Sequence, residues 1–164
     1  MKRALAAGFA IAGSLVCTAA GAQDLALTGL NGQTATLSEA QIAAMPHMAL
    51  TVSVEGKTTT FSGVPLSSLL ALVGAPSGKA LKGPDLADVV VVSAKDGYIV
   101  ALSLAETDPM VRKEAILLAD RADGAALPAG QGPYRLVIEG DLRGARMARM
   151  VTGISVKRLA PRPL

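Results

Sequence analysis

The stretch Gly63-Val64-Pro65-Leu66-Ser67-Ser68-Leu69-Leu70 predicts a junction between a strand and a helix. Pro65 suits the first helical position, because an N–H group there would have no partner within the helix. Apolar side chains then recur at helical spacing over residues 66–73. Gly74 follows, which is typical of the residue just after a helix end. We therefore expect a short helix here, directly after a strand.

Short strands separated by turn signals surround this junction. Asn31-Gly32, Asp96-Gly97 and Asp123-Gly124 are dipeptides that favour tight hairpin turns. The run 88–94 contains four consecutive valines, which predicts a strand that is buried on both faces. Strands are expected at 25–28, 34–37, 48–54, 58–61, 88–94, 98–102, 115–119, 134–138 and 154–156.

Two further short helices are expected to begin at capping boxes. Ser38-Glu39-Ala40-Gln41 and Ser103-Leu104-Ala105-Glu106 each place a long polar side chain three residues after a serine. Residues 75–85, which are rich in proline and glycine, are expected to form a loop. The whole pattern predicts an α+β domain, mainly mixed β-sheet with short helices.

The first 22 residues have the composition of a secretory signal peptide. Lys2-Arg3 forms a basic start, an uncharged apolar run covers 4–16, and Ala20-Gly21-Ala22 supplies small residues before a cleavage point. The apolar run is shorter than the ~20 residues that a membrane-spanning helix needs. We therefore expect residues 1–22 to be a signal peptide and 23–164 to form one periplasmic or secreted domain without a transmembrane segment.

The chain has one cysteine, Cys17, which lies inside the expected signal peptide. The mature chain would then carry no thiol, which suits an oxidising compartment and excludes a cysteine nucleophile. Removal of Lys2-Arg3 also lowers the excess of basic over acidic residues from three to one. Because that charge is small and only 2% of the residues are aromatic, nucleic acid is not an expected partner.

The remaining basic residues are concentrated near the end of the chain. Six follow Asp141 with no acidic residue among them: Arg143, Arg146, Arg149, Lys157, Arg158 and Arg162. We expect the last three to pair with carboxylates of the domain. The first three offer planar donor groups suited to carboxylate, sulfate or phosphate, which predicts a pocket for a small anion. The alternative is a solvated basic edge.

Two other polar residues have alternative interpretations. Asp96 fits the chemistry of the Asp96-Gly97 turn, and alternatively it orients an arginine of the same pocket. His47 is the only histidine and follows Pro46, where a capping or surface role is commoner than a ligand role. One histidine and one cysteine also exclude a zinc-finger type of metal site, so no metal ligand is assigned.

Several segments, in order along the chain, resemble the oxidoreductase molybdopterin-binding domain, a family that includes sulfite oxidase. The stretch 63–70 resembles its G-V-P-L-x-x-L-L helix start, and Asp96-Gly97-Tyr98-Ile99-Val100 resembles its D-G-Y-x-V hairpin. The resemblance covers residues 33–156 and implies the sulfite oxidase-like fold. Residues 45–46 resemble the family's M-P, and residues 115–128 resemble its A-x-L-A…G-x-x-L-P segment. Residues 132–137 resemble G-x-P-x-R-L-V but are one residue shorter, and residues 144–150 resemble G-x-K-x-x-K-W with Met150 in place of the tryptophan.

The resemblance also bears on the cofactor. Members of the family hold molybdenum through the pterin and one cysteine, and the matching stretch here, Thr51-Val52-Ser53-Val54-Glu55, has no cysteine. No cofactor is therefore expected, although the resemblance makes molybdopterin possible. Arg146 and Arg149 replace family lysines near the pterin phosphate, and Arg135 matches a family arginine that we interpret as structural. The cofactor-binding candidates are Arg143, Arg146, Arg149, Arg135 and Asp96.

Three functions are compatible with these patterns. The first is an exported module that binds a small anion or a periplasmic protein partner without molybdenum catalysis. The second is a molybdopterin-dependent oxidoreductase that uses non-cysteine ligation or a partner subunit. The third is a purely structural interaction module. Fold alone does not decide among them, because related folds carry different chemistry.

Overall fold

The computed structural model describes residues 23–159, so the expected signal peptide at 1–22 lies outside the described residues. Two five-stranded sheets and a few short helices make up this part of the chain, which confirms the expected α+β class. Within residues 23–159, no helix has the length and apolar character needed to cross a membrane.

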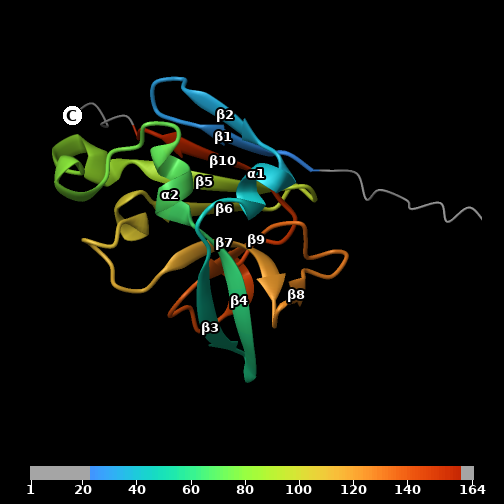
Figure 1. Ribbon diagram of the computed structural model, residues 1–164. Helices are drawn as coiled ribbons and strands as arrows, with labels where there is room; N and C mark the ends of the chain where they lie inside the picture. Colours follow the sequence, from blue (N-terminus) through green and yellow to red (C-terminus); the bar gives the residue numbers. More distant parts are fainter. Residues whose placement is uncertain (1–22, 160–164) are drawn as a thin grey trace, which may run out of the picture.

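The first sheet is mixed and has the order β2-β1-β10-β5-β6 (Figure 1). Strand β1 pairs in parallel with β10, and every other neighbouring pair in this sheet is antiparallel. Its first and last strands along the chain are therefore side by side, which closes the domain. The strands are β1 (Leu25–Thr28), β2 (Thr34–Leu37), β5 (Val89–Ala94), β6 (Ile99–Ser103) and β10 (Val151–Lys157).

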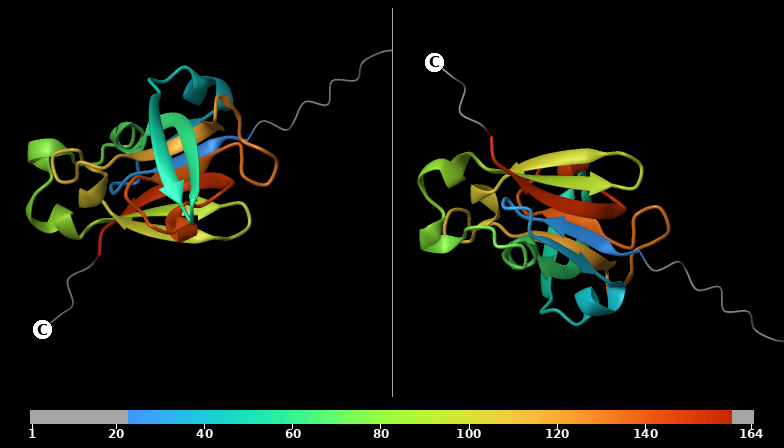
Figure 2. Two further views of the ribbon diagram at one scale, coloured as in Figure 1. Left: turned by 90° about the horizontal axis from the view of Figure 1, so that it is seen from below. Right: turned by 90° about the horizontal axis from the view of Figure 1, so that it is seen from above.

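The second sheet is antiparallel throughout and has the order β3-β4-β7-β8, with β9 also paired to β7. Figure 2 (left) shows its β3–β4 hairpin crossing the strands of the first sheet. Only the two-residue strand β8 lacks a counterpart among the strands expected from the sequence. The strands are β3 (Met48–Val54), β4 (Lys57–Pro65), β7 (Ile116–Ala122), β8 (Ala125–Ala126) and β9 (Arg135–Ile138).

The helices α1 (Glu39–Ala43) and α2 (Leu66–Ala71) occupy expected places. The capping box of α1 is confirmed, because Gln41 N donates to Ser38 Oγ and Ser38 N donates to Gln41 Oε1. The expectation that Pro65 is the first helical residue is wrong. Pro65 has an extended ψ of 133° and pairs with Leu117, so β4 ends where α2 begins.

The second expected capping box is also wrong. The segment forms only the 3-10 turn η3 (Ala105–Thr107), and Ser103 Oγ accepts from Ala105 N instead of capping a helix. The side chain of Glu106 pairs with an arginine 40 residues further along the chain. The expected loop at 75–85 contains two further 3-10 turns, η1 (Gly78–Ala80) and η2 (Gly83–Ala87).

The valine run forms β5 as expected, but it is not buried on both faces. Val90 and Val92 are fully buried, whereas Val89 and Val91 are half-buried. A single face therefore carries the core of this sheet, because the side chains of a strand alternate between its two faces.

Two apolar clusters lie on opposite faces of the second sheet. The larger one is built from the first sheet, α2 and inward residues such as Leu118 and Leu136. The smaller one contains Leu117 and Val137, which point the other way along the same two strands. This smaller cluster forms the base of the candidate site. Its buried members are Leu50, Val52, Phe61, Leu117, Ala119, Val137 and Met147.

Tyr134 provides a test of this packing. Its side chain is 2% exposed, and burial, followed by the charges of Glu39, Asp120 and Asp24, raises the pKa of its phenol to about 12. The ordinary tyrosine pKa is about 10. Because the folded state favours the neutral phenol, the contribution of Tyr134 to folding stability is complete below pH 10 and is lost as the pH rises towards 12.

The chain has two tyrosines and no tryptophan, so this titration can be isolated. In the Tyr98→Phe variant, the phenolate absorbance is expected to rise only near pH 12, together with loss of the circular dichroism of the folded state. A complete phenolate signal at about pH 10 from a protein that stays folded would contradict the burial of Tyr134.

Candidate functional site

A hollow of about 670 Å³ lies beside the smaller apolar cluster. The β3–β4 hairpin forms one side of it, and the segments around β8 and the turn η4 (Gly144–Arg146) form the other. In Figure 2 (left) the orange-red stretch around η4 lies next to the hairpin. A Cβ placed on Gly144 would lie 3.5 Å from Val54 Cγ1, so the two sides approach each other closely.

Four basic and two acidic side chains line the hollow, which leaves an excess of two positive charges. The basic residues include three that the sequence predicted: Arg135, Arg143 and Arg149. They come from β9 and from the segment on either side of η4, so the fold brings separate parts of the chain together. The fourth is Lys57, and the acidic residues are Glu55 and Asp123.

Arg135 is the most firmly held of these cations. Its Nη1 donates to Gln131 Oε1 at 2.7 Å, and its guanidinium carbon lies 5.3 Å from the centre of the Phe61 ring. Its Nε is buried and has no hydrogen-bond partner in the described part of the chain. Burial, and then the charge of Arg149, lower the pKa of Arg135. A half-buried guanidinium that is repelled by a neighbouring cation is stabilised by a bound anion.

Arg143 and Arg149 are exposed, and within residues 23–159 neither they nor Arg135 form an ion pair with a carboxylate. Their charges are therefore free to act on a ligand in the hollow. This behaviour is unlike that of Arg158, which pairs with Asp85 and with the fully buried Asp88. The expectation of carboxylate pairing is confirmed for Arg158. It is wrong for Lys157, which is exposed and forms no ion pair within residues 23–159. Arg162 lies outside the described residues.

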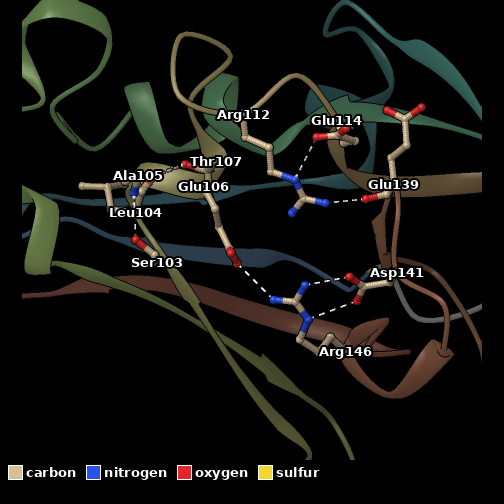
Figure 3. Close-up of polar contacts among 10 residues, drawn as sticks. All are labelled: Ser103, Leu104, Ala105, Glu106, Thr107, Arg112, Glu114, Glu139, Asp141 and Arg146. Atoms are coloured by element: carbon tan, nitrogen blue, oxygen red, sulfur yellow. Dashed lines mark hydrogen bonds and ion pairs between the residues drawn. The ribbon is translucent and has the colours of Figure 1, made fainter.

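Arg146 does not lie with the other candidate arginines. It donates from Nε and Nη2 to the two carboxylate oxygens of Asp141, at 3.0 and 2.7 Å, and from Nη1 to Glu106 at 3.2 Å (Figure 3). Hydrogen bonding to Asp141 is the main cause that raises its pKa. The placement of Arg146 in the anion pocket is therefore corrected: it ties η4 to η3, and it is not among the residues that line the hollow.

A second arginine performs a similar bracing role nearby. Arg112 pairs with Glu114 at 3.5 Å and donates to the backbone oxygen of Glu139, as Figure 3 shows. The Glu139 carboxylate in turn accepts from Ala115 N at 2.8 Å. These contacts fix the start of β7 against the end of β9.

Asp96 is also placed away from the arginines. Its Oδ1 accepts from Tyr98 N at 3.0 Å, and it forms no ion pair in the described part of the chain. The turn interpretation explains it, and the alternative role in orienting a pocket arginine is corrected. The residue that reaches the site from this turn is Tyr98, whose hydroxyl donates to Ala145 O at 2.7 Å and so supports one edge of the hollow.

The strand that corresponds to the family's metal ligand presents valines to the hollow. Val52 and Val54 line it, while the Ser53 hydroxyl lies 2.7 Å from that of Thr58 on the other face of the hairpin. No group of three or more His, Cys, Asp or Glu side chains suited to a metal occurs among residues 23–159. The residues present therefore do not fit a molybdenum held through a protein thiolate.

His47 occupies a structural position away from this strand face. Its Nδ1 lies 2.7 Å from Met45 O, and its Nε2 lies 3.2 Å from Asp120 Oδ2. Both ring nitrogens face acceptors, so the side chain joins the start of β3 to β7. The surface interpretation of His47 is therefore corrected, because its side chain is only 21% exposed and contacts Asp120 on β7.

Sequence reasoning missed most other residues of the hollow, among them Lys57, Phe61 and Gln131. Gln131 lies four residues before Arg135, but only the path of the chain before β9 brings it into hydrogen-bond distance. Phe61 appeared only as a strand residue, and its position under Arg135 depends on the pairing of β4 with β7.

The comparisons with known proteins bear on this geometry. The family model described as the oxidoreductase molybdopterin binding domain matches residues 19–162. The chain belongs to this family. Membership in the molybdopterin-binding domain family confirms the resemblance found in the sequence, and it covers the whole of the described fold.

Among solved structures, this molybdopterin-binding-domain protein is similar to the sulfane dehydrogenase SoxCD from Paracoccus pantotrophus. The TM-score is 0.61 and the identity is 19%, over 82% of this chain and 38% of that one. The similarity therefore supports the sulfite oxidase-like fold, and the chain corresponds to well under half of the matched one. A search of curated proteins found no match.

Proposed function

We propose that this chain is an exported, stand-alone member of its family that binds a small anion in the hollow without molybdenum catalysis. The observation that carries the proposal is the trio Arg135, Arg143 and Arg149, which line one hollow and form no ion pair with a carboxylate among residues 23–159. Uncompensated cations around a concave site favour anionic ligands electrostatically. Export rests on the signal-like residues 1–22.

The absence of molybdenum catalysis is part of the same proposal. The stretch that resembles the family's ligand position has no cysteine, and Val52, Val54 and Glu55 are its residues that line the hollow. The chain's one cysteine lies at position 17. The alternative is a molybdopterin-dependent oxidoreductase with non-cysteine ligation or a partner subunit. Elemental analysis of protein purified from a host that makes molybdopterin distinguishes the two, because stoichiometric molybdenum would favour the alternative. A periplasmic protein partner stays a prediction.

Thermal unfolding with phosphate or sulfate, compared with chloride at the same ionic strength, tests the anion site. Millimolar phosphate or sulfate is expected to raise the unfolding midpoint of the wild type, because a ligand bound only to the folded state stabilises it. In Arg149→Gln, the shift is expected to fall by at least about half, because one charge-assisted contact of the site is lost.

Arg121→Gln is the matched control. It removes the same charge from an exposed position on β7 that does not line the hollow. The control is expected to retain the wild-type response. The proposal is contradicted if neither anion stabilises the wild type, or if the two variants respond alike.

A further inference from the structure

The hollow has an apolar floor in addition to its basic rim. Val52, Phe61 and Met147 line it, and all three belong to the smaller buried cluster. Val54 packs against the same cluster and also lines the hollow. Two residues of the stretch that resembles the family's ligand position, Val52 and Val54, thus adjoin the floor. An apolar surface offers no hydrogen bonds to the oxygens of a bare phosphate or sulfate.

Arg135 lies where the floor and the rim meet. Its guanidinium stands over the Phe61 ring, while Gln131 fixes one end and Arg149 lies close enough to lower its pKa. A ligand group bound to this guanidinium would therefore lie beside an aromatic ring on one side and a second cation on the other. The arrangement suits a molecule that is charged at one end and apolar at the other.

The size of the hollow supports the same conclusion. Its volume of about 670 Å³ falls within the range of roughly 300–1,000 Å³ that is usual for sites of small organic ligands. A water molecule accounts for about 30 Å³ of liquid, and an inorganic oxyanion is only a few times larger. Such an ion would fill only a small part of the hollow.

We propose that the hollow binds organic anions in which a phosphate, sulfonate or carboxylate group is joined to an apolar ring or chain. This inference rests on the proposed anion site and specifies its ligand class. The acid group is held by Arg135 and Arg149. The apolar body covers the floor and reaches Val54; the floor residues are Val52, Phe61 and Met147.

Calorimetric titration of the wild-type protein with inorganic phosphate, phenyl phosphate and phenol at constant ionic strength tests the proposal. Phenyl phosphate is expected to bind at least about tenfold more tightly than inorganic phosphate, because the ring is removed from water on the floor. Phenol alone is expected to bind more weakly than phenyl phosphate. Equal affinity for the two phosphates overturns this inference but leaves the anion site in place. Absence of binding by either phosphate overturns both.

A pair of valine variants locates the ring. Val54→Thr keeps the branched shape of the side chain but makes the floor more polar, so the affinity for phenyl phosphate is expected to fall roughly threefold with that for phosphate unchanged. Val91→Thr makes the same change in the first sheet, away from the hollow, and is expected to leave both affinities unchanged. Equal effects of Val54→Thr on both ligands, or none on either, would overturn the placement of the ring.

Discussion

The Gly63→Ala variant is expected to lose about 3 kcal/mol of unfolding free energy or to fail to fold. A Cβ at this position would lie 2.2 Å from Leu118 O and 2.4 Å from Ala119 Cα. These are backbone atoms of β7, so no side-chain rotation relieves the overlap. The ladder between β4 and β7 shifts its register at Gly63, which explains the close approach. Urea unfolding followed by circular dichroism measures the loss.

Gly153→Ala is the matched control for this substitution. Gly153 also lies in a strand beside a register shift, but a Cβ there would be 3.6 Å from Ala26 O, which is an ordinary contact. Its effect is expected to stay within about 1 kcal/mol of the wild type. If Gly63→Ala were as stable as Gly153→Ala, β4 would not be pressed against β7 as described.

The consequences of Gly63→Ala reach the hollow because Phe61 lies two residues earlier in β4. Displacement of this strand moves the ring beneath Arg135 and the side of the hollow that the hairpin forms. A folded but destabilised variant is therefore also expected to show weaker anion binding. Glycine is therefore required at this position of the G-V-P-L stretch because β4 lies so close to β7, and not because of the helix that follows.

Local signals predicted most elements of this fold. The three turn dipeptides and the Ser38–Gln41 capping box act over a few residues, and they formed as expected. The Ser103–Glu106 stretch has the same pattern but does not form a capping box, because the side chain of Glu106 pairs with Arg146. A local sequence pattern cannot predict a contact between residues 40 positions apart, although that contact competes with the capping box for the side chain of Glu106.

The candidate site was predicted in part for the same reason. The density of arginines after Asp141 indicated the segment that brings Arg143 and Arg149 to the hollow, and the resemblance added Arg135. Arg146 forms ion pairs with two carboxylates, whereas Arg149 lines the hollow, and composition does not distinguish these two roles. That distinction depends on the path of the chain around η4.

The other large effect is expected at Asp108, where Asp108→Ala should cost about 3 kcal/mol of unfolding free energy. The side chain is buried, and its two oxygens accept from different backbone amides, Oδ2 from Gly78 N and Oδ1 from Met110 N at 2.8 Å. Alanine leaves both amides without this partner. The carboxylate thereby holds η1 against the segment that leads into β7, two loops that no strand pairing connects.

Asp108→Asn tests more specifically than alanine whether both accepting oxygens are needed. Asp108→Asn has the same shape but keeps only one accepting oxygen, and its NH₂ group opposes the other amide. Its stability, measured by urea unfolding, is therefore expected to fall between wild type and alanine. Asp96→Ala is the control, because its carboxylate accepts one amide in an exposed turn and should cost about 1 kcal/mol or less. If Asp108→Ala cost no more than Asp96→Ala, the buried carboxylate would not be what joins the two loops.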